Sequence, residues 1–424
     1  MMDFKKTVLD NGLRIIVAPQ KDNPAVTVLV LVSTGSKYET KELNGISHFL
    51  EHMVFKGTEK RPKAIDISTE LDSIGASYNA FTDFEMTGYY AKVDKDHFDK
   101  ALDVVSDIYL GQVFDKEEID KERGPVIEEI NMIEDAPMRK IYYRFDGLLY
   151  GDQPAGWDIA GPKEVIQKIQ REDFLKYKKD HYVASSTVVI VAGAVDAEEA
   201  TEKIKEIFKD IPTGDKKDKL PVKEEQSSPG LLIEDKDTEQ SHLILGVRSY
   251  DIEDERKYAL NVLAEVLGGG MSSRLFQKVR EEMGAAYYVG AGSRELTDHG
   301  KFIARAGANN SLLFDVVEAI LEEFRRMKVE LVEEKELQKA KDHFIGGLML
   351  GLETSDEVAG YYGQQEILVG DLMKPDKLAD KIREVTAEDV REVAKDIFQN
   401  NKLNLAVIGP SIDEERLKSI LKID

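Results

Sequence analysis

Residues 75–93 read GASYNAFTDFEMTGYYAKV, and residues 284–306 read GAAYYVGAGSRELTDHGKFIARA. Each stretch opens with a Gly-Ala turn and continues as two segments with β-like alternation of side chains, which is typical of a β-hairpin. A hairpin of this kind buries one face, so it needs helices or a second sheet to cover that face. The two stretches predict that the chain contains two related halves.

The predicted elements around the two hairpins follow the same order, which supports an internal repeat. In each half a strand and two helices precede the hairpin, and an amphipathic helix, an acidic helix and a closing strand follow it. The predicted strands are Val26–Ser33, Ser186–Val195, His242–Arg248 and Lys402–Ile408, and the predicted helices are Glu42–Phe55, Ala64–Ile74, Asp96–Leu110, Lys116–Ile133, Glu255–Leu267, Ser273–Glu282, Leu312–Met327 and 332–348.

The stretch between the halves, residues 213–230, is polar, contains two prolines and two glycines, and shows no helical or strand period. We therefore predict an α+β fold of two homologous domains, residues 1–212 and 231–424, joined by this linker. Each domain is expected to hold a mixed, largely antiparallel β-sheet packed with α-helices. The alternative is a chance similarity between two unrelated α+β patterns.

Composition excludes several classes of function. The 424 residues include 58 Lys and Arg against 81 Asp and Glu, a formal charge of −23, so nucleic acid and anionic membranes are disfavoured partners. The chain has no cysteine, which excludes disulfides, a thiolate nucleophile and cysteine-based metal sites. We find no apolar run of about 20 residues and no signal-peptide pattern, and we expect a cytoplasmic protein.

With no cysteine, a metal site must use His, Asp or Glu, and the chain has only seven histidines. His48 and His52 in the sequence HFLEH lie four residues apart, on one face of a helix, where they can share a tetrahedral Zn²⁺. Glu51 flanks that face and can take a proton from metal-bound water. The alternative is a pair of surface histidines on an amphipathic helix.

A third ligand is expected from the acidic helix Lys116–Ile133, which offers Glu122, Glu128 and Glu129. Glu122 and Glu129 are seven residues apart, so they share a face. The alternative for any one of them is an ordinary solvated helix face. Gly124-Pro125 lies between them and is expected to kink or restart the helix.

HFLEH, followed after 76 residues by Glu129 and with Glu122 seven residues before it, resembles the inverted-zincin metallopeptidases. That family contains pitrilysin, insulysin and the mitochondrial processing peptidase. The resemblance covers the whole chain. It implies that His48, His52 and Glu129 hold one Zn²⁺ per chain, that Glu51 is the general base, and that Glu122 supports the site. It also implies a homodimer.

Flanking segments extend the resemblance: VSTGSKYE (residues 32–39), FKGTEKRP (residues 55–62) and YNAFT (residues 78–82). In the family the last of these is a strand edge that binds substrate as an added β-strand, which transfers to Asn79, Ala80 and Phe81. The resemblance also implies that Arg280 and Tyr287 hold the peptide and stabilise the tetrahedral intermediate. From the residues alone these positions are an ordinary strand, a surface arginine and a core tyrosine.

The sequence therefore predicts a zinc-dependent endopeptidase that hydrolyses peptides or unfolded or precursor segments. The first half holds the metal, and the second half, which has no H-x-x-E-H, supplies Arg280 and Tyr287. Two alternatives remain open. One is a non-catalytic scaffold or the partner subunit of a heterodimeric processing peptidase, and the other is a metal-binding protein without hydrolytic activity.

Overall fold

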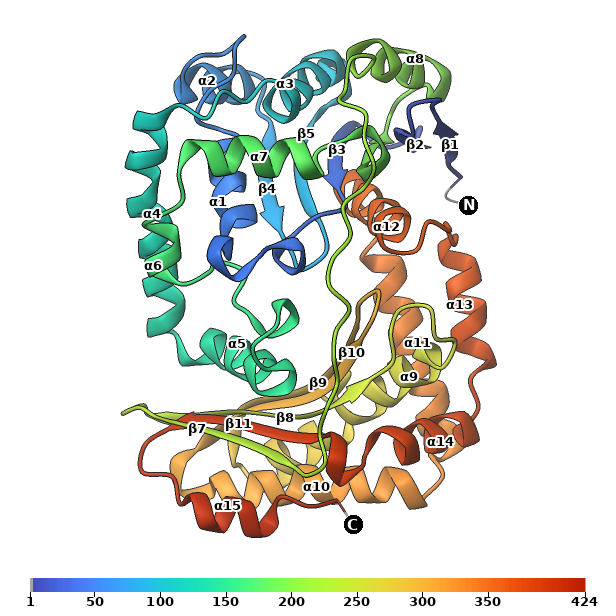
Figure 1. The fold of residues 1–424 in the computed structure, drawn as a ribbon. Helices are drawn as coiled ribbons and strands as arrows, with labels where there is room; N and C mark the ends of the chain where they lie inside the picture. The colour runs from blue at the N-terminus through green and yellow to red at the C-terminus, as the bar shows by residue number, and fades with distance from the viewer. Residues whose placement is uncertain (1–2, 424) are drawn as a thin grey trace. The chain divides into compact units, whose positions relative to one another are not determined.

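The computed structural model describes residues 3–423, which form two compact units (Figure 1). The first unit comprises the residues up to 131 together with 157–220 and 349–375, and the second comprises 132–156, 221–348 and the residues from 376 onward. Each unit is built on one mixed sheet covered by helices. The predicted α+β fold class is confirmed.

The strands are β1 (Lys5–Val8), β2 (Arg14–Pro19), β3 (Ala25–Val32), β4 (Ser77–Thr82), β5 (Thr87–Asp94), β6 (Thr187–Gly193), β7 (Gly230–Asp235), β8 (Gln240–Ser249), β9 (Ala286–Glu295), β10 (Gly300–Asn309) and β11 (Leu403–Gly409). The helices are α1 (Ile46–Met53), α2 (Ala64–Asp72), α3 (Phe98–Leu110), α4 (Lys116–Asp135), α5 (Pro137–Tyr150), α6 (Lys163–Ile166), α7 (Arg171–His181), α8 (Ala197–Ile207), α9 (Lys257–Gly268), α10 (Leu313–Val329), α11 (Glu334–Leu350), α12 (Ser355–Leu368), α13 (Pro375–Glu384), α14 (Ala387–Ile397) and α15 (Glu414–Ile420).

The first sheet has six strands in the order β1-β2-β6-β3-β5-β4, and its neighbours are antiparallel except for β2 and β6. Both faces of β3 are covered, which explains its nearly continuous apolar sequence. Its valines at 26, 28, 30 and 32 belong to the core that also contains residues of α1 and α3. The opposite face meets α12, where Thr27 and Ser355 share a hydrogen bond of 2.8 Å.

The second sheet has five strands in the order β7-β11-β8-β10-β9, and only β7 and β11 are parallel. Leu243, Leu245 and Val247 of β8 enter a core shared with α9 and α10. The other face of β8 meets α5, where Ile244 packs in a cluster with Phe145. Each sheet therefore lies between helices, as the predicted fold class requires.

Helices α5 and α12 are exchanged between the halves of the sequence. α5 follows the acidic helix α4 in the first half but belongs to the second unit, while α12 follows the acidic helix α11 in the second half but belongs to the first unit. The compact units therefore differ from the predicted domains in two segments: residues 132–156 belong to the second unit, and residues 349–375 belong to the first. The division into two homologous domains, residues 1–212 and 231–424, stays a prediction.

The helix predicted over Glu42–Phe55 is shorter in the structure, because α1 begins only at Ile46. Gly45 precedes it with φ of +100°, a left-handed conformation that favours glycine and interrupts a right-handed helix. α4 runs from Lys116 to Asp135 with Pro125 inside it, so the helix does not restart at the proline. Between residues 3 and 423 we find no helix with the length and apolar character that crossing a membrane requires.

Candidate metal centre

α1 presents two different faces, and this difference sets up the site. Ile46, Phe49 and Leu50 are fully buried in the core of the first unit. His48 and His52 project from another face, with ring centroids 4.8 Å apart. The spacing of apolar residues thus fixes the rotation of the helix and aims both imidazoles in one direction.

Glu129 on α4 meets both imidazoles. Its Oε2 atom lies 3.4 Å from His48 Nε2 and 3.3 Å from His52 Nε2. Two ligand atoms bound to one tetrahedral Zn²⁺ at about 2.1 Å lie roughly 3.4 Å apart. The three side chains therefore fit a zinc ion, and between residues 3 and 423 they are the one such group of three His or carboxylate side chains.

Glu122 supports His52 from the side away from Glu129. His52 Nδ1 lies 3.1 Å from Glu122 Oε1, and because an ionised carboxylate only accepts, the Nδ1–H must donate. Nε2 of His52 is then free to bind a metal, which is the carboxylate–histidine arrangement of many zinc sites. The other oxygen of Glu122 is paired with Lys56 Nζ at 2.6 Å. Pro125 does not displace Glu122 from this position.

The charged groups of the site strongly shift the pKa values of His52 and Glu129. Burial alone would lower the pKa of His52, but its hydrogen bonds to Glu122 and Glu129, with the nearby charge of Glu51, raise this pKa to about 9. Hydrogen bonds from His48 and His52 hold the pKa of Glu129 well below its ordinary value. A metal ion entering the site therefore meets an ionised carboxylate and competes with a proton for His52.

Glu128 lies outside the cluster. Its side chain is exposed and accepts a hydrogen bond of 3.2 Å from Asn131 on the same helix. It points about 100° away from Glu129 around the helix axis. Of the three predicted candidates on this helix, the structure thus brings Glu129 and Glu122 to the histidines and leaves Glu128 at the surface.

β4, which holds Asn79, Ala80 and Phe81, is the edge strand beside α1. It pairs with β5 on one side, with Ala80 opposite Tyr89, and no strand of the described chain pairs with its other side. α1 packs against β4 (Figure 1), and Thr82 Oγ1 reaches the carbonyl oxygen of Ser47 at 3.4 Å. A free strand edge therefore lies in the same unit as His48 and next to its helix.

Arg280 and Tyr287 lie together in the second unit. Arg280 is on a π-helix, Phe276–Glu282, and its guanidinium carbon is 5.6 Å from the centre of the Tyr287 ring. Tyr287 is the extra residue of a β-bulge, because Ala286 and Tyr288 pair with successive residues of β10. Its side chain is 73 % exposed. π-helices and bulges both occur preferentially next to functional sites.

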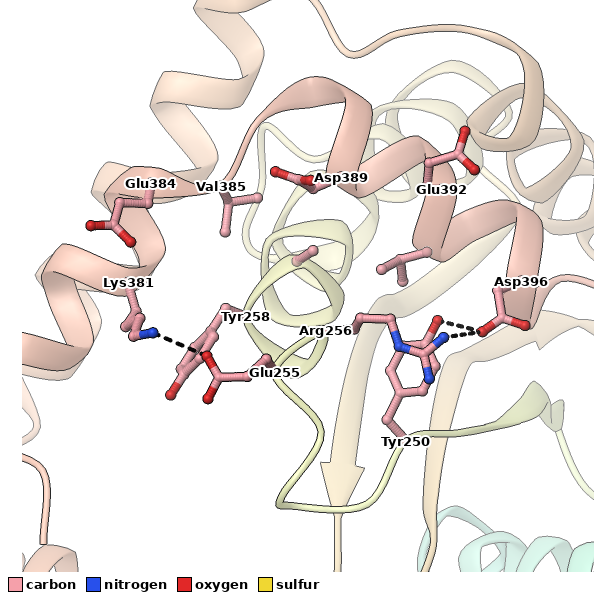
Figure 2. A pocket seen from close by; sticks show the side chains of 12 residues that line it. Tyr250, Glu255, Arg256, Tyr258, Lys381, Glu384, Val385, Asp389, Glu392 and Asp396 are labelled. Carbon is pink, nitrogen blue, oxygen red and sulfur yellow. Dashed lines mark hydrogen bonds and ion pairs between the residues drawn. The ribbon is translucent and has the colours of Figure 1, made fainter. Parts of the chain in front are cut away.

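The second unit also contains a cavity of about 550 Å³ that is lined by residues of α9, α13, α14 and the loop between β8 and α9 (Figure 2). Its two basic groups are paired with lining carboxylates: Lys381 with Glu255 at 3.0 Å, and Arg256 with Asp396 at 2.9 Å. Tyr250 donates a further hydrogen bond of 2.8 Å to Asp396. No histidine lines this cavity, so it does not offer the ligand set seen on α1 and α4.

Comparison with known proteins matches most of the chain to one family. Residues 14–162 match the family described as insulinase, peptidase family M16, and residues 168–344 match the peptidase M16 inactive domain. An uncharacterized zinc protease of Bacillus subtilis is 36 % identical over 96 % of this chain and 98 % of its own length. Another from Streptomyces coelicolor is 34 % identical over 97 % and 90 %.

Two solved structures share the fold. A protease from Helicobacter pylori has a TM-score of 0.89 at 25 % identity and covers 96 % of this chain and all of its own. A structure described as the peptidase M16 inactive domain from Pseudomonas fluorescens has the same TM-score at 17 % identity, with 97 % and 99 % coverage. The second likeness concerns the fold alone.

Proposed function

Because the chain belongs to the insulinase family, peptidase family M16, we propose that it is a zinc-dependent endopeptidase acting on peptides or unfolded protein segments. The observation that carries this proposal is the convergence of His48, His52 and Glu129 at distances that suit tetrahedral zinc. The relatives named as zinc proteases support it. The predicted family resemblance is confirmed.

We propose that His48, His52 and Glu129 would hold one zinc ion. When bound, zinc supplies a Lewis acid that activates water and polarises a carbonyl group. Glu51 lies on the same helix and is half-buried, and its charge acts on His52. It takes the proton of the attacking water and delivers it to the leaving amine. Glu122 fixes the orientation of His52 through Nδ1.

The substrate is proposed to bind as an extended strand along the free edge of β4, at Asn79, Ala80 and Phe81. An unpaired edge offers backbone N–H and C=O groups to an incoming peptide. Arg280 and Tyr287 are proposed to donate to the oxyanion that develops at the scissile carbonyl. Their mutual contact and the exposure of Tyr287 support this role.

The alternative of a non-catalytic partner subunit finds less support, because this chain retains every residue of the H-x-x-E-H set and Glu129. The same chain also carries Arg280 and Tyr287. We therefore propose a homodimer in place of an obligate heterodimer. The direct test of the proposed function is incubation with a mixed peptide library, with and without a chelator, read by mass spectrometry. Chelator-sensitive cleavage supports it, and a zinc-loaded protein that cleaves nothing contradicts it.

A His52→Ala variant is expected to lose zinc and peptidase activity together. Removing one of three ligands weakens zinc binding by more than about 100-fold, since loss of supporting groups alone costs 10–100-fold. Zinc content measured by mass spectrometry and cleavage of an unstructured peptide check this. His97→Ala removes an exposed histidine outside the site and is the matched control. A His52→Ala protein with one firmly bound zinc would refute the ligand assignment.

A Tyr287→Phe variant is expected to lower kcat/KM by about 100-fold while zinc content stays unchanged, because it removes one donor to the oxyanion. Steady-state kinetics on a fluorogenic peptide measure this effect. Tyr288→Phe is the control, since the neighbouring hydroxyl is bonded to His242 at 3.0 Å within the second unit. Equal kcat/KM values for the two variants would show that the hydroxyl group of Tyr287 does not act in the reaction.

A further inference from the structure

We propose that the five residues Gly35–Glu39 position α1, here called the zinc helix, and β4, here called the substrate strand, relative to each other. The segment follows β3 and precedes α1, within the first unit. One end of it holds the N-terminus of α1, and the other end holds the turn between β4 and β5. The inference rests on the proposed function, because it gives a role to residues that touch neither metal nor substrate.

Glu39 holds the beginning of the zinc helix. Its side chain is 5 % exposed, and Oε1 accepts a hydrogen bond of 2.8 Å from the backbone N–H of Ser47. Oε2 accepts from the backbone N–H of Gly45 at 2.7 Å and from Nδ2 of Asn44 at 2.9 Å. The N-cap residue of α1 is Gly45, which has no side chain to cap the helix, so Glu39 supplies the missing acceptors.

This cap matters because α1 is only eight residues long and carries both histidine ligands. Ser47 is adjacent to His48, so a bond to its N–H restrains the first turn at the position of the first ligand. Burial raises the pKa of Glu39 to about 7, so its hydrogen bonds, and not a full negative charge, restrain the start of the helix. Glu39 therefore restrains both the position and the rotation of the helix that aims the imidazoles.

The other end of the segment holds the β4–β5 turn. The N–H groups of Ser36 and Lys37 donate to the carbonyl oxygens of Asp83 and Phe84 at 3.2 and 2.9 Å. Lys37 Nζ and Glu85 Oε1 form an ion pair of 2.7 Å in which both side chains are at most 1 % exposed. The turn at the end of the edge strand is thus bound by hydrogen bonds and an ion pair to the same five-residue segment that caps the zinc helix.

Gly35 permits this close approach. A Cβ atom at this position would lie 2.0 Å from the carbonyl oxygen of Asp83, a distance that no real contact shows. Its φ of −171° is extended backbone that alanine can adopt, so sterics alone require glycine here. A methyl group at residue 35 must push the β4–β5 turn away while leaving charge and local backbone preference unchanged.

The zinc end is tested with Glu39→Gln. Whichever way the amide is oriented, at least one N–H of the helix start faces an NH₂ group instead of an acceptor. We expect zinc affinity, measured by competition with a chromophoric chelator, to fall about tenfold. Hydrogen exchange of residues 45–53 in the metal-free protein is expected to accelerate, with α3 unchanged. Glu42→Gln, an exposed glutamate three residues away, is the control.

The strand end is tested with Gly35→Ala. We expect KM for a peptide to rise severalfold while zinc affinity stays within twofold of the parent value. Gly360→Ala is the matched control, because a Cβ on that helical glycine meets no atom within 4 Å. If Gly35→Ala fails to fold, the paired variant Lys37→Met with Glu85→Gln replaces it. This change removes both charges of the ion pair, and it also removes the 3.6 Å contact of Glu85 with Lys219.

The outcomes separate this inference from the proposed function. A parent protein that binds zinc and cleaves peptides, with Glu39→Gln unchanged in zinc affinity and hydrogen exchange, overturns the positioning role alone. A parent that binds zinc but cleaves nothing contradicts the proposed function, while the zinc affinities still decide the role of Glu39. If Gly35→Ala lowers zinc affinity and leaves KM unchanged, the assignment of the strand end is wrong.

Discussion

A Glu51→Gln variant is expected to bind zinc with unchanged stoichiometry and to lose turnover by a factor of about 10²–10⁴. Glutamine keeps the size of the side chain and its place on α1 but cannot accept the proton of the attacking water. Glu51 is not one of the three ligand side chains that converge in the site, so the metal remains bound. The result separates catalysis from metal binding, which His52→Ala removes together.

The measurement is kcat on an unstructured peptide, with zinc content determined on the same sample. Glu128→Gln is the matched control, because it makes the same chemical change at an exposed position on α4 beside Glu129. The control is expected to retain the parent rate. If Glu51→Gln cleaved peptides at the parent rate, another group would have to act as general base, and the proposed mechanism would be wrong.

The second large effect concerns the exchanged helices. A fragment of residues 1–230 is expected not to fold cooperatively, because it lacks α12, which covers one face of the first sheet. Leu31 and Ile190 lie under Gly363 of that helix and would be exposed. Each large apolar side chain returned to water costs about 1.5–3 kcal/mol. A few such losses approach the whole stability of a typical domain, about 5–15 kcal/mol.

Thermal unfolding followed by circular dichroism tests this expectation. The control is the full chain cut within the exposed stretch 213–218, which breaks one peptide bond but keeps α12 present. The cut protein is expected to retain a cooperative transition, and the fragment is expected to show none. A fragment that unfolds cooperatively at the temperature of the intact chain would show that α12 is dispensable for the first unit.

Local sequence patterns predicted the two hairpins, the helices next to them and the pair of histidines on one helix face. The alternation in residues 75–93 predicts the hairpin β4–β5. The i, i+4 spacing of His48 and His52 predicts that their side chains lie together, because both belong to one helix. Helical periodicity left Glu122, Glu128 and Glu129 as candidates on α4, and the family resemblance selected Glu129 among them. The hairpins and the helical spacings depend on neighbours within a few residues, which is the range over which such patterns carry information.

The missed features depend on contacts between distant segments. The segment that forms α12 has no clear amphipathic period and was not among the predicted helices, so no local pattern indicates that it covers the first sheet. The cap on α1 was missed for a similar reason, because Glu39 lies six residues before Gly45 and outside the usual capping positions. The signal that could have pointed to it is the segment VSTGSKYE itself, which ends in a glutamate shortly before α1.

Pro125 does not end α4. A proline within a helix removes one hydrogen bond, yet α4 continues through it, with Ile119, Val126 and Ile130 buried in the core of the first unit. Burial of that apolar face offsets the local cost. Glu122 therefore keeps the same face as Glu129, and both reach His52.

The exchange of α5 and α12 also determines when the protein can fold during its synthesis. The nascent chain completes all six strands of the first sheet once β6 has left the ribosome, at residue 193. The sheet face that α12 covers stays without this helix until residues 355–368 have been translated. Throughout that interval the growing chain displays an apolar surface of the kind that chaperones bind and that promotes aggregation.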